Sequence, residues 1–283
     1  MKHLRRQIRT LFMAAFVVFS LAACTNQFAY NTLPFWIDYY LSDYVDMTPS
    51  QQAQLERDLD AFHEWHRKTE LPQIQALLNQ LERDTAKPLS YSQLGAYHKL
   101  VNERIRGSVE GLTPALVNLI RSLNDKQAAQ WIETMNERID EGIEKANKGT
   151  LEDQRERRQG RLIERAEFWI DKVNNKQQAQ LLEMATYQIE MRPVFYGIRD
   201  ELVAELTGIL NNRQAPDLAQ QINAYFSRLI SFQSDAYHND MAIYLARRYE
   251  LLQRLDRHLS NKQRKALRTK LASYSDDITS VTE

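Results

Sequence analysis

The chain has 283 residues, 43% of them hydrophobic, and 37 lysines and arginines balance 37 aspartates and glutamates. A chain of this length can bury one sizeable hydrophobic core without metals or disulfides. The lack of a basic excess argues against a nucleic acid partner, and the single cysteine excludes an internal disulfide.

The first 23 residues have the build of a secretory signal peptide, a basic start followed by an apolar run. Residues 11–22 are too few to cross a bilayer core, which needs ~20 apolar residues. The run ends in Leu21-Ala22-Ala23-Cys24, which resembles the lipobox of bacterial lipoproteins and implies cleavage before Cys24 and lipidation of its sulfur. Thr25, where Asp would retain such a lipoprotein on the inner membrane, favours the periplasmic face of the outer membrane. Cleavage leaves 33 basic against 37 acidic residues.

Residues 24–47 are expected to form a lipidated tether and a short aromatic helix, with seven aromatic residues between 28 and 44. Two alternatives follow for this segment. It can lie in the bilayer interface, where tryptophan and tyrosine are favoured, or it can pack on the rest of the protein. No lysine or arginine occurs between Arg9 and Arg57 to attract anionic lipid, which favours packing on the protein.

Residues 48–283 show helical periodicity almost throughout and no sustained alternation, so no strand is predicted. We expect an all-α fold, an antiparallel bundle or curved stack of about eight helices, several of them kinked by proline. Thr48-Pro49 and Thr113-Pro114 have the order that starts a helix. Whether the chain divides into two lobes near residue 149 or forms one long bundle stays open. Two of the apolar stripes are Leu94, Tyr97, Val101, Ile105 and Ser108, and Met241, Leu245, Leu252 and Leu255, the second interrupted by Arg248.

A nine-residue signature recurs along this domain. Each copy has an apolar residue, then a capping residue, then glutamine three positions further on, which is the pattern of a capping box. A looser copy begins at Leu89 and a degenerate one at Leu210, while Thr150 with Asp153 forms a variant box. The four full copies have these cap and glutamine residues: Thr48 and Gln51, Asn124 and Gln127, Asn174 and Gln177, Ser260 and Gln263.

Two resemblances follow from these residues. The signature resembles the L-T-x-x-Q motif of the Spy-type periplasmic chaperones, although only Thr48 supplies the threonine, and it implies a chaperone-like role. A wider pattern resembles an uncharacterised family of proteobacterial lipoproteins, a domain of unknown function, and implies a lipoprotein with a helical fold. The residues that carry it are Tyr30-Asn31-Thr32-Leu33, Trp36, Asp43 to Thr48, Gln51, Trp65-His66-Arg67 and Glu70-Leu71-Pro72.

His63, His66 and Glu70 are the nearest approach to a metal site, because residues at i, i+3 and i+7 share a helical face. Arg67 stands where the zincin motif H-E-x-x-H needs its second histidine, so protease chemistry is excluded. The favoured interpretation is a histidine pair without metal, either satisfied by hydrogen bonds or tipped into solvent, and no catalytic residue or cofactor is predicted.

We therefore expect a non-enzymatic envelope lipoprotein that serves as a binding, scaffold or chaperone-like factor. Its expected partners are the membrane, through the lipid anchor, and envelope proteins or unfolded periplasmic clients, with no nucleic acid. The alternative is a metal-dependent envelope enzyme or metal sensor that uses His63, His66 and Glu70.

Overall fold

The computed structural model describes residues 29–283, and every regular element in that range is a helix. The predicted all-α class is confirmed. Residues 29–283 form the ten helices given below rather than about eight, because short breaks at Met191 and at residues 212–217 separate helices. The helices are α2 (Leu33–Ser42), α3 (Pro49–Asp84), α4 (Tyr91–Ser122), α5 (Asp125–Asn147), α6 (Leu151–Ile170), α7 (Asn175–Glu190), α8 (Arg192–Asn211), α9 (Leu218–Ser231), α10 (His238–Arg257) and α11 (Asn261–Thr282).

Six of these helices begin with a complete capping box, in which the cap side chain and the residue three positions on satisfy each other's backbone N–H groups. The prolines behave differently from one another. Pro49 is the first residue of α3, as predicted, and Pro193 lies at the start of α8. Pro114 lies inside α4, so the prediction that Thr113-Pro114 starts a helix is wrong. Thr113 instead donates from Oγ1 to the Val109 carbonyl, 3.1 Å away, and to Asn223 of α9.

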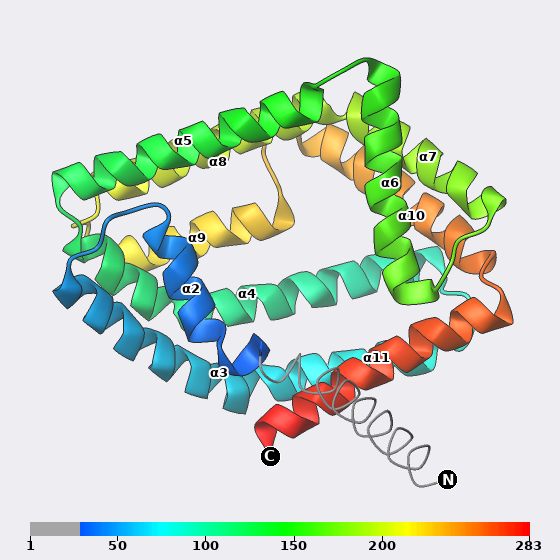
Figure 1. Cartoon of the computed structure of the whole chain (residues 1–283), viewed down its shortest axis with the longest axis horizontal. Coiled ribbons are helices and arrows are strands. Elements are labelled where there is room, and N and C mark those ends of the chain that lie inside the picture. The colour runs from blue at the N-terminus through cyan, green and yellow to red at the C-terminus, as the bar shows by residue number, and fades with distance from the viewer. Residues whose placement is uncertain (1–28) are drawn as a thin grey trace, which may run out of the picture.

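The helices are arranged as a ring (Figure 1). The long pair α3 and α4 forms one side, and α5 with α8 forms the opposite side. Helices α6, α7 and α10 close one end of the ring, and α11 returns to pack along α3. Residues 123–124 join α4 to α5 at the other end.

Two hydrophobic clusters stabilise the ring. The larger joins buried residues of α3, α4, α5, α8, α9 and α10, and Leu55, Ile198, Leu210 and Leu218 are among its least exposed members. The smaller joins α6 and α7 to Leu251 of α10, with residues of α11 packed against it. The larger cluster takes residues from both sides of position 149, so the clusters do not correspond to two consecutive halves of the chain.

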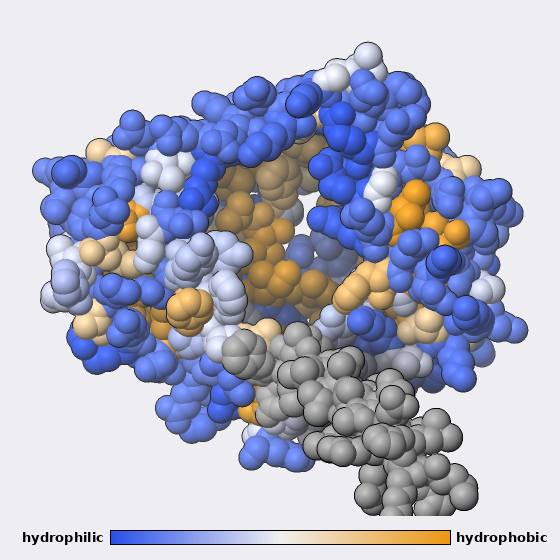
Figure 2. Space-filling view, viewed as in Figure 1, coloured by the Kyte–Doolittle hydropathy of each residue, from blue (hydrophilic) through white to orange (hydrophobic). Residues whose placement is uncertain are grey.

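A space-filling view shows that the middle of the ring is hollow (Figure 2). The background is visible through it, and apolar side chains line much of the wall that faces the viewer. We call this hollow the central opening. Most of the outer surface in the same view is hydrophilic.

Candidate functional site

The repeated signature forms two glutamine pairs. Gln51 of α3 meets Gln127 of α5, and Gln177 of α7 meets Gln263 of α11. In each pair the two side-chain amides hydrogen bond reciprocally, with N–O distances of 2.7 and 3.1 Å in the first and 2.8 and 3.0 Å in the second. The helix starts that the sequence predicts separately are therefore joined two by two.

Every polar atom of the second pair is satisfied. The second amide hydrogen of Gln177 reaches the His258 carbonyl at 3.3 Å, and that of Gln263 reaches the Lys172 carbonyl at 2.9 Å. Each accepting carbonyl lies two residues before the partner's cap, and each amide oxygen also accepts the N–H of its own cap at 2.9 Å. The first pair repeats this arrangement. A glutamate would cap equally well but could not donate, which explains why all four copies carry glutamine.

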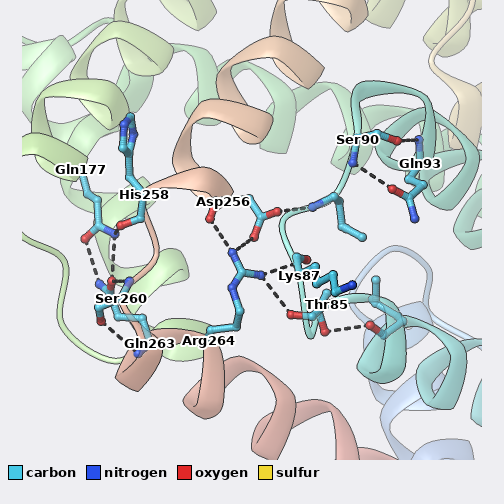
Figure 3. Close-up of polar contacts among 12 residues, drawn as sticks. Thr85, Lys87, Ser90, Gln93, Gln177, Asp256, His258, Ser260, Gln263 and Arg264 are labelled. Carbon is cyan, nitrogen blue, oxygen red and sulfur yellow. Dashed lines mark hydrogen bonds and ion pairs between the residues drawn. The ribbon is translucent and has the colours of Figure 1, made fainter.

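A second polar cluster lies beside the Gln177–Gln263 pair (Figure 3). Arg264 of α11 forms an ion pair with Asp256 of α10 at 3.0 Å and donates to the Thr85 carbonyl at 3.0 Å. Asp256 also accepts the backbone N–H of Leu89 at 2.6 Å. Both charged side chains are largely buried, and they tie the end of α10 and the start of α11 to the link between α3 and α4.

Two of the three candidate metal ligands, His66 and Glu70, have polar partners, whereas the Nε2 of His63 is buried and has no hydrogen-bond partner among the described residues. The Nδ1 of His66 accepts from the Tyr30 hydroxyl at 3.1 Å, and its Nε2 donates to Ser108 at 3.2 Å, because the Ser108 hydroxyl itself donates to the Arg104 carbonyl. The Tyr30 ring also packs against the His63 ring at a tilt of 40°, with ring centroids 4.6 Å apart. Burial lowers the pKa of both histidines, and the neighbouring positive charge of Arg67 lowers that of His63 further.

Glu70 is buried and pairs with Arg104 at 3.5 Å instead of turning to the histidines. Within residues 29–283, no three or more histidine, cysteine, aspartate or glutamate side chains are grouped so as to hold a metal ion. The hydrogen bonds from Tyr30 to His66 and from His66 to Ser108 connect the N-terminal segment to α3 and α4.

The middle of α4 is exposed where the sequence shows an apolar stripe. Val101 is 41% exposed and Ile105 is 45% exposed. Both lie on the same face of α4 as His98, at i+3 and i+7. His98 lines a pocket of about 370 Å³ together with residues of α8, α9 and α10, so Val101 and Ile105 lie on the face of α4 that borders this pocket.

The rest of that pocket is mostly apolar, with Arg248 as a cation beside His98. In the sequence, Arg248 is visible only as a charged residue that interrupts the apolar stripe of α10. That interruption could have predicted that Arg248 lies at a solvent-accessible site rather than in the core. His98 has its pKa lowered by burial and then by the charge of Arg248, so a neutral ring faces the pocket near neutral pH. The apolar lining residues are Phe195, Ile230, Phe232, Met241, Tyr244 and Leu245.

A second, smaller groove of about 330 Å³ lies between α3 and α11. Its walls are almost wholly apolar, and Tyr30 at the start of the described chain and Trp169 of α6 border it. The aliphatic residues along it are Leu71, Ile74, Leu78, Ile278 and Val281.

The aromatic segment packs on the protein, as the favoured alternative predicts, but by one face only. Ile37 and Leu41 of α2 pack against the larger hydrophobic cluster, while aromatic side chains on the other face stay exposed. Cys24 and the signal peptide lie outside the described residues. None of the described helices combines the length and the apolar character that a membrane span requires.

Comparison with known proteins gives one match. The model of a family of unknown function, DUF6279, matches residues 43–222, which is more than half of the chain. No curated protein and no solved structure matches.

Proposed function

The chain belongs to the DUF6279 family, whose description assigns no function. We propose that it is a non-enzymatic, lipid-anchored envelope protein. In this proposal, the central opening binds apolar segments of unfolded or partly folded polypeptides. The observation that carries the proposal is the pair of exposed aliphatic side chains, Val101 and Ile105, in the middle of a helix that borders a pocket lined by apolar residues.

Folding leaves the apolar side chains of Val101 and Ile105 partly exposed. Large apolar side chains exposed at a concave site are typical of a binding surface. Full burial of an exposed valine or isoleucine side chain is worth about 1.5–3 kcal/mol, and Val101 and Ile105 are already more than half buried, so each contributes about 1 kcal/mol on binding. Several such contacts together give useful affinity without a specific sequence in the ligand. An extended polypeptide also fits an opening that passes through the ring (Figure 2).

The proposed location rests on the sequence. The lipobox-like string before Cys24 supports lipidation, and Thr25 supports the outer membrane. Unfolded outer-membrane and periplasmic polypeptides, which expose apolar segments, are then the clients that this surface would meet.

The test measures suppression of aggregation. Residues 25–283, which contain both hydrophobic clusters, are mixed at near-stoichiometric ratio with a chemically unfolded model client, and light scattering is followed. We expect suppression by the parent protein and at least about a fivefold weaker effect from Val101→Asp with Ile105→Asp, since each charge would have to be desolvated against the client.

The control is Ile243→Asp. Ile243 is 63% exposed on the face of α10 opposite Met241 and Leu245, so this variant adds an acid to an exposed apolar site away from the pocket. It should keep full activity. Absence of suppression by the parent protein, or equal losses in the α4 variant and the control, would refute binding through the central opening.

A further inference from the structure

Four aromatic side chains of α2 form a continuous exposed surface, which we call the α2 aromatic face: Phe35, Trp36, Tyr39 and Tyr40. Their exposed fractions run from 43 to 60%, and neighbouring ring centroids lie 5.4–6.3 Å apart. Only two other aromatic residues within 29–283 are exposed to this degree, Tyr91 and Phe168, and they lie on different helices.

Helix α2 is fixed to the protein by its other face. Ile37 and Leu41 contact the larger hydrophobic cluster, so the packing of α2 on the protein does not depend on its exposed aromatic side chains. An exposed aromatic cluster on a helix that is already docked indicates a binding surface for a second partner.

The two acidic residues on and next to α2, Asp38 and Asp43, do not oppose such a partner, because both contact the rest of the protein. Asp38 accepts from Gln52 of α3 at 3.4 Å, and Asp43 pairs with Arg138 of α5 at 3.0 Å. The α2 aromatic face itself therefore carries no charge, and it has no cations that would select anionic lipid.

We infer that the α2 aromatic face inserts into the interfacial region of a phospholipid bilayer and fixes the orientation of the ring on the membrane. Tryptophan and tyrosine rings favour that depth, because the ring is apolar while the indole N–H or the phenol hydroxyl stays hydrated. The chain outside the described residues ends next to this helix, and Cys24 precedes Phe35 by eleven residues, which span at most ~36 Å. The inference uses the anchored location proposed above, but it does not depend on ligand binding by the central opening.

The experiment uses residues 25–283, which have no anchor, and vesicles of zwitterionic phosphatidylcholine. We expect flotation with the vesicles, little change between low and high salt, and at least about a tenfold lower partition coefficient when all four rings are replaced by serine. A matched pair controls for general stickiness: Phe35→Ser with Tyr40→Ser should weaken binding, while Phe168→Ser with Tyr91→Ser should not.

Trp36 gives a second readout. Lipids brominated near the headgroup should quench the fluorescence of the parent protein, and Trp36→Phe should keep most of the binding while losing most of the quenching. No binding to these vesicles, equal losses in the two double variants, or quenching that survives Trp36→Phe would overturn the inference. Mass spectrometry of Cys24 and the client assay test the anchor and the central opening separately, so a failure of one is distinguished from a failure of the others.

Discussion

Replacing Gln177 by glutamate should destabilise the protein strongly, although glutamate is an ordinary capping-box residue. The amide nitrogen of Gln177 donates to the His258 carbonyl and to the Gln263 side chain, and the residue is fully buried. Glutamate keeps the acceptor for its own cap but loses both donors, and it places a carboxylate against an amide oxygen. The His258 carbonyl loses its donor, the Gln263 amide oxygen keeps only the N–H of Ser260, and the new carboxylate is buried without a donor to replace them. A buried charge without a partner is strongly destabilising, so we expect a loss of about 3–5 kcal/mol in the free energy of unfolding near pH 7.

Gln93 is the matched control, because it completes the same capping box at the start of α4 without a glutamine partner. Gln93→Glu should change the free energy of unfolding by less than about 0.5 kcal/mol. Urea denaturation followed by circular dichroism measures both variants. Because burial raises the pKa of the new carboxyl, part of the loss in Gln177→Glu should be recovered as the pH falls and the group becomes a neutral donor. Equal losses at the two positions would refute the argument that pairing, rather than capping, requires glutamine.

Two further predictions concern the contacts of α3 with α4. A Cβ at Gly111 would lie 1.9 Å from the Trp65 ring, so Gly111→Ala should lower the free energy of unfolding by about 1–3 kcal/mol, whereas Gly142→Ala, where nothing lies within 4 Å, should not lower it. Burial lowers the pKa of His66 below its ordinary value of 6.5, so the folded state favours the neutral ring. Its contribution to stability is therefore complete above about pH 6.5 and is lost as the pH falls below that value. Thermal unfolding at pH 7.5 and 5.5 should show this loss, and His66→Gln should reduce the difference; an unchanged difference would contradict the assignment to His66.

The local part of the fold could be predicted from the sequence. The caps at Thr48, Asn124, Asn174 and Ser260 form where the signature predicts them, because a capping box involves residues three positions apart. The pairing of these helix starts depends on residues 76 and 86 positions apart, which no local pattern reports. All four paired copies carry glutamine rather than glutamate, but so does the unpaired copy at Ser90 and Gln93, so this choice alone could not have revealed the pairing.

The candidate site could be predicted less well. The stripe through Val101 and Ile105 has helical spacing, but spacing shows only that a face is apolar, and it does not distinguish a face that meets another helix from one that lines an opening. The prediction of a helix start at Thr113-Pro114 failed because it, too, rested on a local pattern alone. A proline after threonine is typical of a helix start, yet here the helix continues and Thr113 bonds to the preceding turn.

The ring is closed covalently at only one corner. The segment from α2 to α4 joins the remainder through the single backbone link at residues 123–124, whereas the far corner is held by side-chain contacts, such as those of Arg264 with the Thr85 carbonyl and of Asp256 with the Leu89 N–H (Figures 1 and 3). The packing of α3 on α11, of α4 on α9 and of α4 on α10 therefore has to hold the ring shut, because no second backbone link does so.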